Sequence, residues 1–148
     1  MNDEQRYQQG ITVRSEVLGE KHVNRSLEYL NDFNADFQNF ISRFAWGDVW
    51  SRPGMPRHTR SLVTIAVLLA LGRADELRMH LRACFNNGVT KDDLKELILH
   101  CSLYAGLPAA NAAMHMAEEV FAEMGIAPQP LNEKQLQQEQ ANQQLNQE

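Results

Sequence analysis

The sequence predicts an all-α protein, an antiparallel helical bundle, from three observations. Apolar residues recur at spacings of three and four, helix start and stop signals recur through the second half, and the alternating Val, Ile and Thr runs typical of strands are missing. The 148 residues, 43% of them hydrophobic, suit one compact domain. Short connections between the expected helices favour antiparallel neighbours.

The first expected helix covers residues 26–44 and is followed by an irregular connection at the two prolines of residues 52–56. We interpret its aromatic stripe as a packing surface, either for the rest of the domain or for a neighbouring subunit. The stripe has spacings of four, three and four and consists of Phe33, Phe37, Phe40 and Phe44.

Four further helices are expected, and together they complete a single helical domain of residues 1–130. The remainder, residues 131–148, is dominated by Gln, Asn and Glu, and we expect a disordered or frayed tail there. The first of the four helices is capped by Thr59 or Ser61 and stops at Gly72, and the second covers residues 74–87 and stops at Gly88. The third covers residues 91–104 and begins at a capping box of Thr90 and Asp93, and the fourth runs from Pro108 to about Gly125.

The charge balance argues against several partners. The net charge is −5 without a lysine-rich block, so nothing favours nucleic acid or an anionic membrane. The longest apolar run, residues 62–71, has about half the length that spans a bilayer. The polar N-terminus lacks an apolar signal segment, so we expect a cytoplasmic protein whose Cys84 and Cys101 are thiols that fill the core.

Arg73, Glu76 and His80 stand at positions i, i+3 and i+7 of a predicted helix, which places them on one stripe beside apolar residues. Charge on or beside a buried face marks a candidate site. Glu76 would raise the pKa of His80 whereas burial would lower it, and the sequence leaves that balance open. The alternative is an ordinary surface pair of Glu76 and His80 with a solvated Arg73.

A second cluster, Arg57, His58 and Arg60, stands at the start of an apolar helix, where cations oppose the helix dipole. Anion binding explains this placement, and a solvated basic turn or subunit salt bridges explain it equally well. His22 has no evident partner. No metal-ligand spacing, phosphate loop or GxSxG motif is present, which leaves acid/base chemistry without a metal or other cofactor.

Three segments, RHTRSLVTIAVLLALGR, ELRMHLRACFNNGVT and LYAGLPAANAAM, resemble the successive blocks of the carboxymuconolactone decarboxylase family. That family lies in the superfamily that also holds the alkyl hydroperoxidase D proteins. The resemblance implies the all-helical fold of the superfamily, assembled into trimers or hexamers. Redox members carry CxxCxxxH where this chain has Arg73, Glu76 and His80, and a glutamate common among them falls at Ser61.

The resemblance implies cofactor-independent decarboxylation of γ-carboxymuconolactone (4-carboxymuconolactone) to β-ketoadipate enol-lactone, a step of bacterial protocatechuate breakdown. This dicarboxylate lactone accepts the electron pair of its own leaving carboxylate at the ring carbonyl. His80, oriented by Glu76, is the expected general acid, which protonates the dienolate or donates to the carbonyl oxygen. The expected substrate-binding residues, with an arginine on the spectator carboxylate, are Arg73, Arg57, His58 and Arg60.

Two other functional classes compete with this expectation. A thiol oxidoreductase or peroxidase-related protein of the same superfamily is disfavoured, because the CxxC motif is missing. In a non-enzymatic helical scaffold, the charged residues of both clusters would form salt bridges at interfaces. Hydrolysis or isomerisation of a related lactone on the same scaffold is also compatible with a general acid and an anion-binding group.

Overall fold

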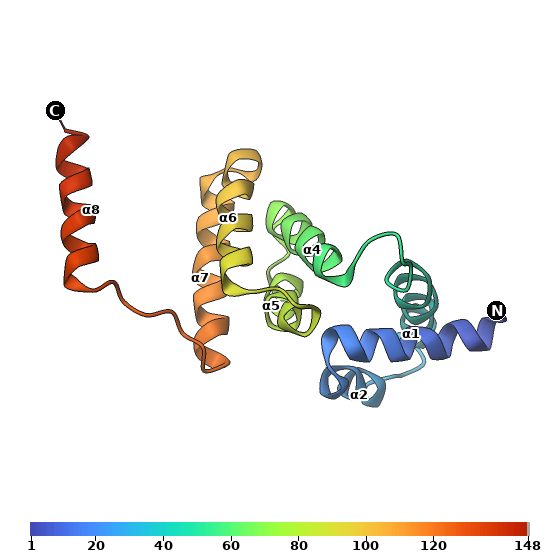
Figure 1. Cartoon of the computed structure of the whole chain (residues 1–148). Helices are drawn as coiled ribbons and strands as arrows, with labels where there is room; N and C mark the ends of the chain where they lie inside the picture. The colour runs from blue at the N-terminus through green and yellow to red at the C-terminus, as the bar shows by residue number, and fades with distance from the viewer. Residues whose placement is uncertain (148) are drawn as a thin grey trace.

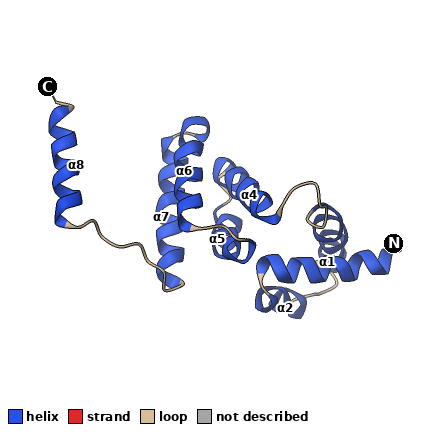
Figure 2. Ribbon diagram, in the orientation of Figure 1, coloured by secondary structure: helices blue, strands red, loops and turns tan. Residues whose placement is uncertain are grey.

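A computed structural model describes residues 1–147, and all the regular structure of these residues is helical, as Figure 2 shows. The predicted all-α class is therefore confirmed. Figure 1 shows the order of the elements along the chain. They are α1 (Asp3–Leu18), α2 (Glu20–Glu28), α3 (Ala35–Phe40), the π-helix η1 (Ile41–Val49), α4 (Arg57–Leu71), α5 (Ala74–Ala83), the 3-10 helix η2 (Cys84–Asn87), α6 (Lys91–Ala105), α7 (Leu107–Glu123) and α8 (Glu133–Leu145).

The helices α4, α5, α6 and α7 share one apolar core, in which α6 and α7 lie side by side (Figure 1). Each contributes a side chain that is almost completely excluded from water, namely Ile65, Leu81, Leu94 and Val120. Burial of one such side chain contributes about 1.5–3 kcal/mol to folding. This core fixes the position of α5, which carries the candidate site.

Helix boundaries in this half follow the predicted signals. Gly72 and Gly88 end α4 and η2 in the left-handed conformation, which glycine adopts without steric cost. Thr90 and Asp93 form the predicted capping box at the start of α6. The four helices of the second half are therefore confirmed, with a 3-10 turn as the last part of the second one.

The start of α4 differs from the expectation. Pro56 occupies the N-cap position and no side chain caps the helix, so the predicted caps at Thr59 and Ser61 are wrong. Proline has no N–H to satisfy and its backbone is held at a φ that suits the entry to a helix. The cluster of Arg57, His58 and Arg60 consequently lies within the first turns of α4.

The N-terminal helices form a second, smaller core that packs on α5. Val17 and Val23 are fully buried, Trp46 is 6% exposed, and Ala83 of α5 completes the cluster. The sequence analysis did not anticipate α1, because most of its first half is polar. The second core covers one face of α5 that would otherwise meet solvent.

Within this unit, α1 and η1 cross at close range through glycine. A Cβ added at Gly10 would collide with the carbonyl oxygen of Ser42, and one added at Gly47 would lie 2.5 Å from the carbonyl oxygen of Arg6. Both clashes are with backbone atoms, which do not rotate away as a side chain does. The crossing therefore requires residues without a side chain at these two positions.

The expected continuous helix over residues 26–44 is wrong. α2 ends at Glu28 and α3 begins at Ala35, because the side chain of Asn31 accepts hydrogen bonds from the backbone N–H groups of Phe33 and Asn34, both at 2.9 Å, and forms a turn.

The aromatic stripe is exposed as a result. Phe33 is 93% exposed, and Phe37, Phe40 and Phe44 retain 40% exposure or more. The interpretation that the stripe packs on the rest of the domain is wrong for the described chain, and packing on a neighbouring subunit stays a prediction.

The C-terminal helix α8 stands away from the bundle after an extended connection (Figure 1), and none of its residues is buried. Where the sequence analysis expected a disordered or frayed tail, Asn132 and Gln135 form a capping box that starts a helix. Among the described residues, no helix is both long enough and apolar enough to cross a membrane.

Replacing Gly10 with alanine should destabilise the fold, because the added Cβ meets the backbone of Ser42. We expect the free energy of unfolding to fall by about 1–3 kcal/mol in a denaturant titration, as overpacking does elsewhere. Gly54→Ala is the matched control, since a Cβ there meets nothing within 4 Å. Equal stability of the two variants would contradict the close crossing.

Candidate active site

The helix α5 presents the predicted stripe from solvent toward the interior. Arg73 is its N-cap residue, and the acidic Asp75 and Glu76 lie in the first turn, where negative charge complements the helix dipole. Leu77 and Leu81 bury the adjoining face in the bundle core. Arg73 and Glu76 are exposed, whereas His80 is 9% exposed. The stripe thus ends at a buried imidazole.

The balance that the sequence left open is decided by burial. The pKa of His80 is lowered to about 4, mainly by loss of solvent and also by the nearby His22, while the charge of Glu76 opposes both effects. Among residues 1–147, no ion pair joins Glu76 to His80. His80 is therefore a neutral imidazole near pH 7, with one N–H donor and one acceptor nitrogen.

The basic cluster on α4 is largely engaged within the chain. Arg57 pairs with Glu16 of α1 at 2.6 Å, and the Nε2 of His58 lies 2.9 Å from Asp93 of α6. The bond from His58 is the main reason why the pKa of Asp93 is lowered. Because α1 and α6 lie on different sides of α4, the structure does not bring Arg57 and His58 onto one wall.

Arg60 is less satisfied than its two neighbours. It donates to the backbone carbonyl of Arg52 at 3.3 Å, and its Nε is buried without a hydrogen-bond partner. Neither Arg60 nor Arg73 pairs with a carboxylate among the described residues. These two arginines are the predicted cations that remain available to an anion.

Ser61, the position at which the resemblance places a glutamate of redox members, is 1% exposed. Its hydroxyl accepts a hydrogen bond from the side chain of Asn87 at 2.9 Å. Asn87 also donates to the backbone carbonyl of Val17 at 3.5 Å. This position links α4, η2 and α1.

Two residues that sequence reasoning missed approach the stripe from the N-terminal helices. His22 of α2 acts electrostatically on His80, and buried Arg14 of α1 acts on His22. No spacing rule finds them, because they lie 58 and 66 residues before His80 and on other helices. A cavity of about 230 Å³ lies between α2 and α5, lined by Leu18, His22, Met79, Arg82, Ala83 and Asn86.

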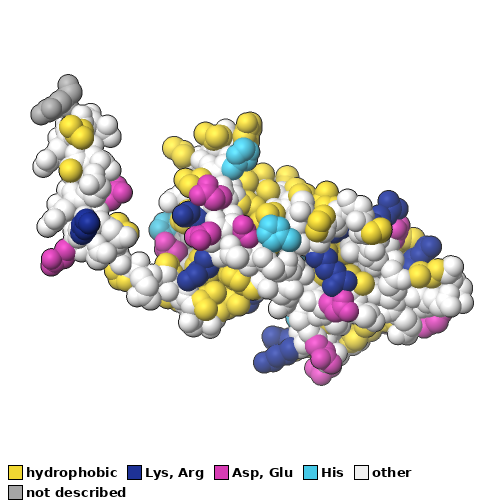
Figure 3. Space-filling view, viewed as in Figure 1, with side chains coloured by type: hydrophobic (Ala, Val, Ile, Leu, Met, Phe, Trp, Pro, Cys, Tyr) yellow, Lys and Arg dark blue, Asp and Glu magenta, His cyan; other side chains and the backbone are white. Residues whose placement is uncertain are grey.

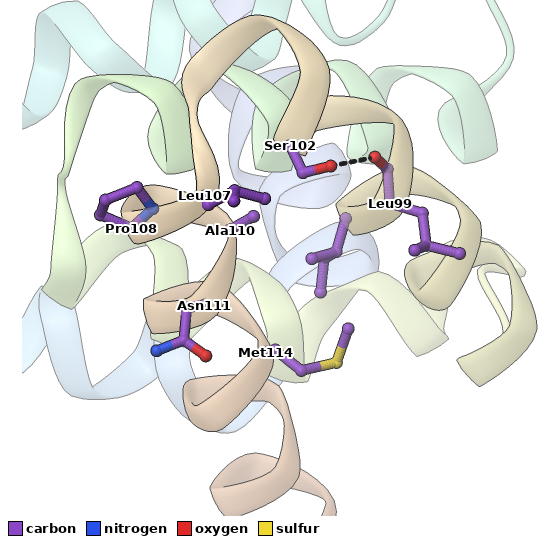
Figure 4. Close-up of a pocket in the computed structure, with 8 residues that line it drawn as sticks. Leu99, Ser102, Leu107, Pro108, Ala110, Asn111 and Met114 are labelled. Atoms are coloured by element: carbon purple, nitrogen blue, oxygen red, sulfur yellow. Dashed lines mark hydrogen bonds between the residues drawn. The ribbon is translucent and has the colours of Figure 1, made fainter. Parts of the chain in front are cut away.

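Neither His80 nor Glu76 lines this cavity, and neither lines the larger cavities. The one between α6 and α7 has a volume of about 620 Å³ and is lined mainly by apolar side chains (Figure 4). Its polar groups are Ser102, whose hydroxyl donates to the carbonyl of Leu99 at 2.6 Å, and Asn111. Neither group is a strong acid or base, so this cavity is suited to apolar contact.

The thiols lack the properties of a redox site. Cys84 is 1% exposed, and burial raises its pKa to about 12. Burial also raises the pKa of Cys101, which is partly exposed on α6. Reactive cysteines have lowered pKa values, so both thiols are poor nucleophiles. Within residues 1–147, no group of three or more His, Cys, Asp and Glu side chains is placed to hold a metal ion.

Comparison with known proteins assigns the family. A sequence profile of the carboxymuconolactone decarboxylase family matches residues 35–119, more than half of the chain. The chain belongs to this family. The 4-carboxymuconolactone decarboxylase of Acinetobacter baylyi is 87% identical over 132 residues, which cover 89% of this chain and 98% of that protein. The nitrosuccinic acid decarboxylase of Metarhizium robertsii is 36% identical over 118 residues, covering 80% of this chain and 82% of that protein.

A 4-carboxymuconolactone decarboxylase sequence from Pseudomonas putida is 56% identical over 48 residues, which cover 32% of this chain and all of that sequence. The stripe of Arg73, Glu76 and His80 lies inside the segment that matches the carboxymuconolactone decarboxylase profile. Arg14 and His22 lie before it. The N-terminal side of the candidate site is therefore outside the matched family segment.

Proposed function

We propose that the chain is a carboxy-lyase that converts 4-carboxymuconolactone to β-ketoadipate enol-lactone without a cofactor. The observation that carries this proposal is the 87% identity to the Acinetobacter baylyi decarboxylase over nearly the full length of that protein. The reaction belongs to protocatechuate breakdown, and we assign it to the cytoplasm. A buried neutral histidine beside acidic and basic groups supports the proposal chemically.

The substrate is its own electron acceptor. Its reacting ring carbon carries the leaving carboxylate and an acetate arm, and loss of CO₂ sends an electron pair through the ring double bond to the lactone carbonyl. The protein therefore has to orient the leaving carboxylate, stabilise negative charge on the carbonyl oxygen and supply a proton to carbon.

A neutral His80 suits the second of its two expected roles. Its N–H donates to the carbonyl oxygen as negative charge develops there, and the buried position strengthens that hydrogen bond. The negative charge of Glu76 acts in the opposite direction to burial and raises the pKa of His80, and we propose that Glu76 also orients the imidazole when substrate is bound. Such a preorganised donor contributes about 3–4 kcal/mol to lowering the barrier.

Arginines act best on the spectator carboxylate, because a cation on the leaving carboxylate would stabilise the ground state. Arg60 and Arg73 are our first choices, since neither has a carboxylate partner among the described residues. Arg57 and His58 pair with acids of α1 and α6 and hold the first turn of α4 in place. We therefore propose that Arg57 and His58 support substrate binding indirectly, because they hold the helix turn that carries Arg60.

The second similar decarboxylase supports the substrate class. Nitrosuccinic acid, named for the Metarhizium robertsii protein, is a succinic acid with a nitro group. 4-Carboxymuconolactone likewise has one carbon that carries a carboxylate, an acetate arm and a path to an electron-accepting group. We infer that the site recognises this substituted succinate unit, with the acetate arm as the spectator.

We further propose that copies of the chain assemble into a trimer or hexamer. Figure 3 shows hydrophobic side chains gathered over α4 and α6. A contiguous apolar face of this kind is unusual on a monomer and is typical of an interface. Its exposed side chains, between 48% and 80% accessible, are Val63, Val67, Leu71, Leu99, Leu103, Tyr104 and Leu107.

The proposed function is tested by supplying freshly made 4-carboxymuconolactone to the purified protein without any added cofactor. We expect release of CO₂ together with formation of the enol-lactone. Spectroscopy of the product monitors the formation of the enol-lactone. Failure of the wild-type protein to release CO₂ would reject the proposed activity.

His80→Ala should lower kcat by about two to three orders of magnitude, because the donor to the carbonyl oxygen is lost. The helical circular dichroism signal should stay unchanged. His115→Ala is the control, since His115 is exposed on α7, and its kcat should match that of the wild type. Near-normal turnover by His80→Ala would remove His80 from the mechanism.

Arg60→Ala should mainly raise KM, by about ten- to a hundredfold, because binding of the spectator carboxylate is lost equally in ground and transition states. Steady-state kinetics separate this effect from a loss of kcat. Lys134→Ala on the exposed helix α8 should change neither parameter. A collapse of kcat at constant KM would show that Arg60 has another role.

Leu103→Asp should reduce the assembly to smaller species, because a charge is placed on a face that a second copy covers. Light scattering coupled to gel filtration measures the mass, and the wild type should be a trimer or hexamer. Leu145→Asp changes a similarly exposed leucine of α8 and should preserve the assembly. A monomeric wild type would refute the assembly.

A further inference from the structure

The proposed mechanism has assigned one acid/base group so far, His80, although the reaction needs two proton donors. The carbonyl oxygen requires a hydrogen-bond donor while charge develops, and the neighbouring ring carbon has to receive a proton. A neutral imidazole has one N–H, so His80 does not serve both atoms at once. A second donor therefore has to lie close to His80.

His22 is the residue that meets this requirement by position. It lies on α2 and lines the 230 Å³ cavity together with Met79 and Ala83 of α5. These two residues flank His80 along the same helix, one position before and three positions after it. His80 itself does not line the cavity, but the charge of His22 lowers the pKa of His80, so a second imidazole from an element outside the matched family segment lies near the first.

The surroundings of His22 carry an excess of positive charge. Arg14 of α1 is 7% exposed, its Nε is buried without a partner, and its recorded side-chain bond is to neutral Gln38 at 3.3 Å. Among the described residues it pairs with no carboxylate. A buried cation without a counter-charge is costly, and a bound anion relieves that cost.

The other charged groups near His22 come from α2 and α5. Arg25 lies on α2 itself, and Arg82 and His80 come from α5. Arg82 lines the cavity but is already paired with Glu123 of α7 at 2.5 Å. The nearest acid of the stripe, Glu76, is exposed and acts on His80. The local charge is therefore open to a dianionic substrate.

We propose that His22 is a second catalytic histidine, which gives a proton to the ring carbon while His80 holds the carbonyl oxygen. This assignment rests on the proposed decarboxylation. The bond to the leaving carboxylate breaks, and its electron pair moves through the ring to the carbonyl oxygen. The resulting dienolate then takes a proton from the imidazolium of His22, and CO₂ leaves.

Solvent access divides the two roles. The proton that goes to carbon is consumed in every turnover and has to be replaced from water, whereas a donor to the carbonyl oxygen keeps its proton. His22 is partly exposed at the cavity wall, and His80 is 9% exposed. His22 is accordingly the group that exchanges protons with solvent.

In this proposal, His22 becomes protonated when the substrate binds. In the free protein, burial and the cations Arg14 and Arg25 lower its pKa. A bound dianion offsets both cations and raises that pKa again, so a proton is taken up when the dianion binds. Arg14 is then a positioning residue that keeps His22 neutral until substrate arrives.

Proton uptake is tested by calorimetric titration with succinate, an unreactive dianion with the substrate skeleton. Titrations at about pH 6.5, close to the ordinary pKa of histidine, are run in two buffers with different ionisation enthalpies. The wild type and His80→Gln should take up a proton on binding, and His22→Gln should bind succinate without uptake. Equal uptake by His22→Gln and wild type would overturn the proposal, as would loss of uptake in His80→Gln alone.

Kinetics with the true substrate give an independent readout. His22→Gln should lower kcat by about a hundredfold or more with little change in KM, as loss of a general acid does. Added imidazole should restore part of the turnover of His22→Ala, which a merely structural role would not allow. His115→Gln is the control. If the wild type is active and His22→Gln has the same kcat, only this inference is overturned. If the wild type is inactive, the proposed function is overturned.

Discussion

The docking of the N-terminal helices onto α5 and η2 is the interaction on which the site depends. Val17 lies in the last turn of α1, where backbone carbonyls have no partner within their own helix. Its carbonyl accepts the side-chain amides of Asn86 at 3.2 Å and of Asn87 at 3.5 Å, and Asn87 also binds Ser61 of α4. One unsatisfied helix end thereby joins α1, α4 and η2, and the N-terminal core packs on α5 through Ala83 and Met79.

The electrostatics of the site follow from that docking. Burial is the main cause of the lowered pKa of His80, and the N-terminal core packs on the same helix through Ala83, three residues further along. The same unit brings Arg14 and His22 into an interior that contains few acids. The result is a partly enclosed region with neutral imidazoles and uncompensated positive charge, which is suited to an anionic substrate that carries its own electron acceptor.

Two residues of the basic cluster on α4 have a structural role that differs from the role proposed for the stripe. Arg57 and His58 reach α1 and α6, so these two side chains fix the first turn of α4 against its neighbours. The two thiols of the described chain have raised pKa values, Cys84 at about 12. Thiols of this kind are poor nucleophiles, in agreement with a mechanism that uses proton chemistry, as proposed above for His80.

Local signals in the sequence are sufficient to predict the helices of the second half and the common face of Arg73, Glu76 and His80 on α5. The stops at Gly72 and Gly88 and the capping box of Thr90 and Asp93 are local, since they depend on backbone groups within a few residues. Only the tertiary structure decided the protonation of His80, the exposure of the phenylalanine stripe and the approach of His22. These properties depend on contacts between helices that are far apart in the chain. The atoms that exclude water from His80 and so lower its pKa belong to such contacts, which a local sequence pattern does not describe.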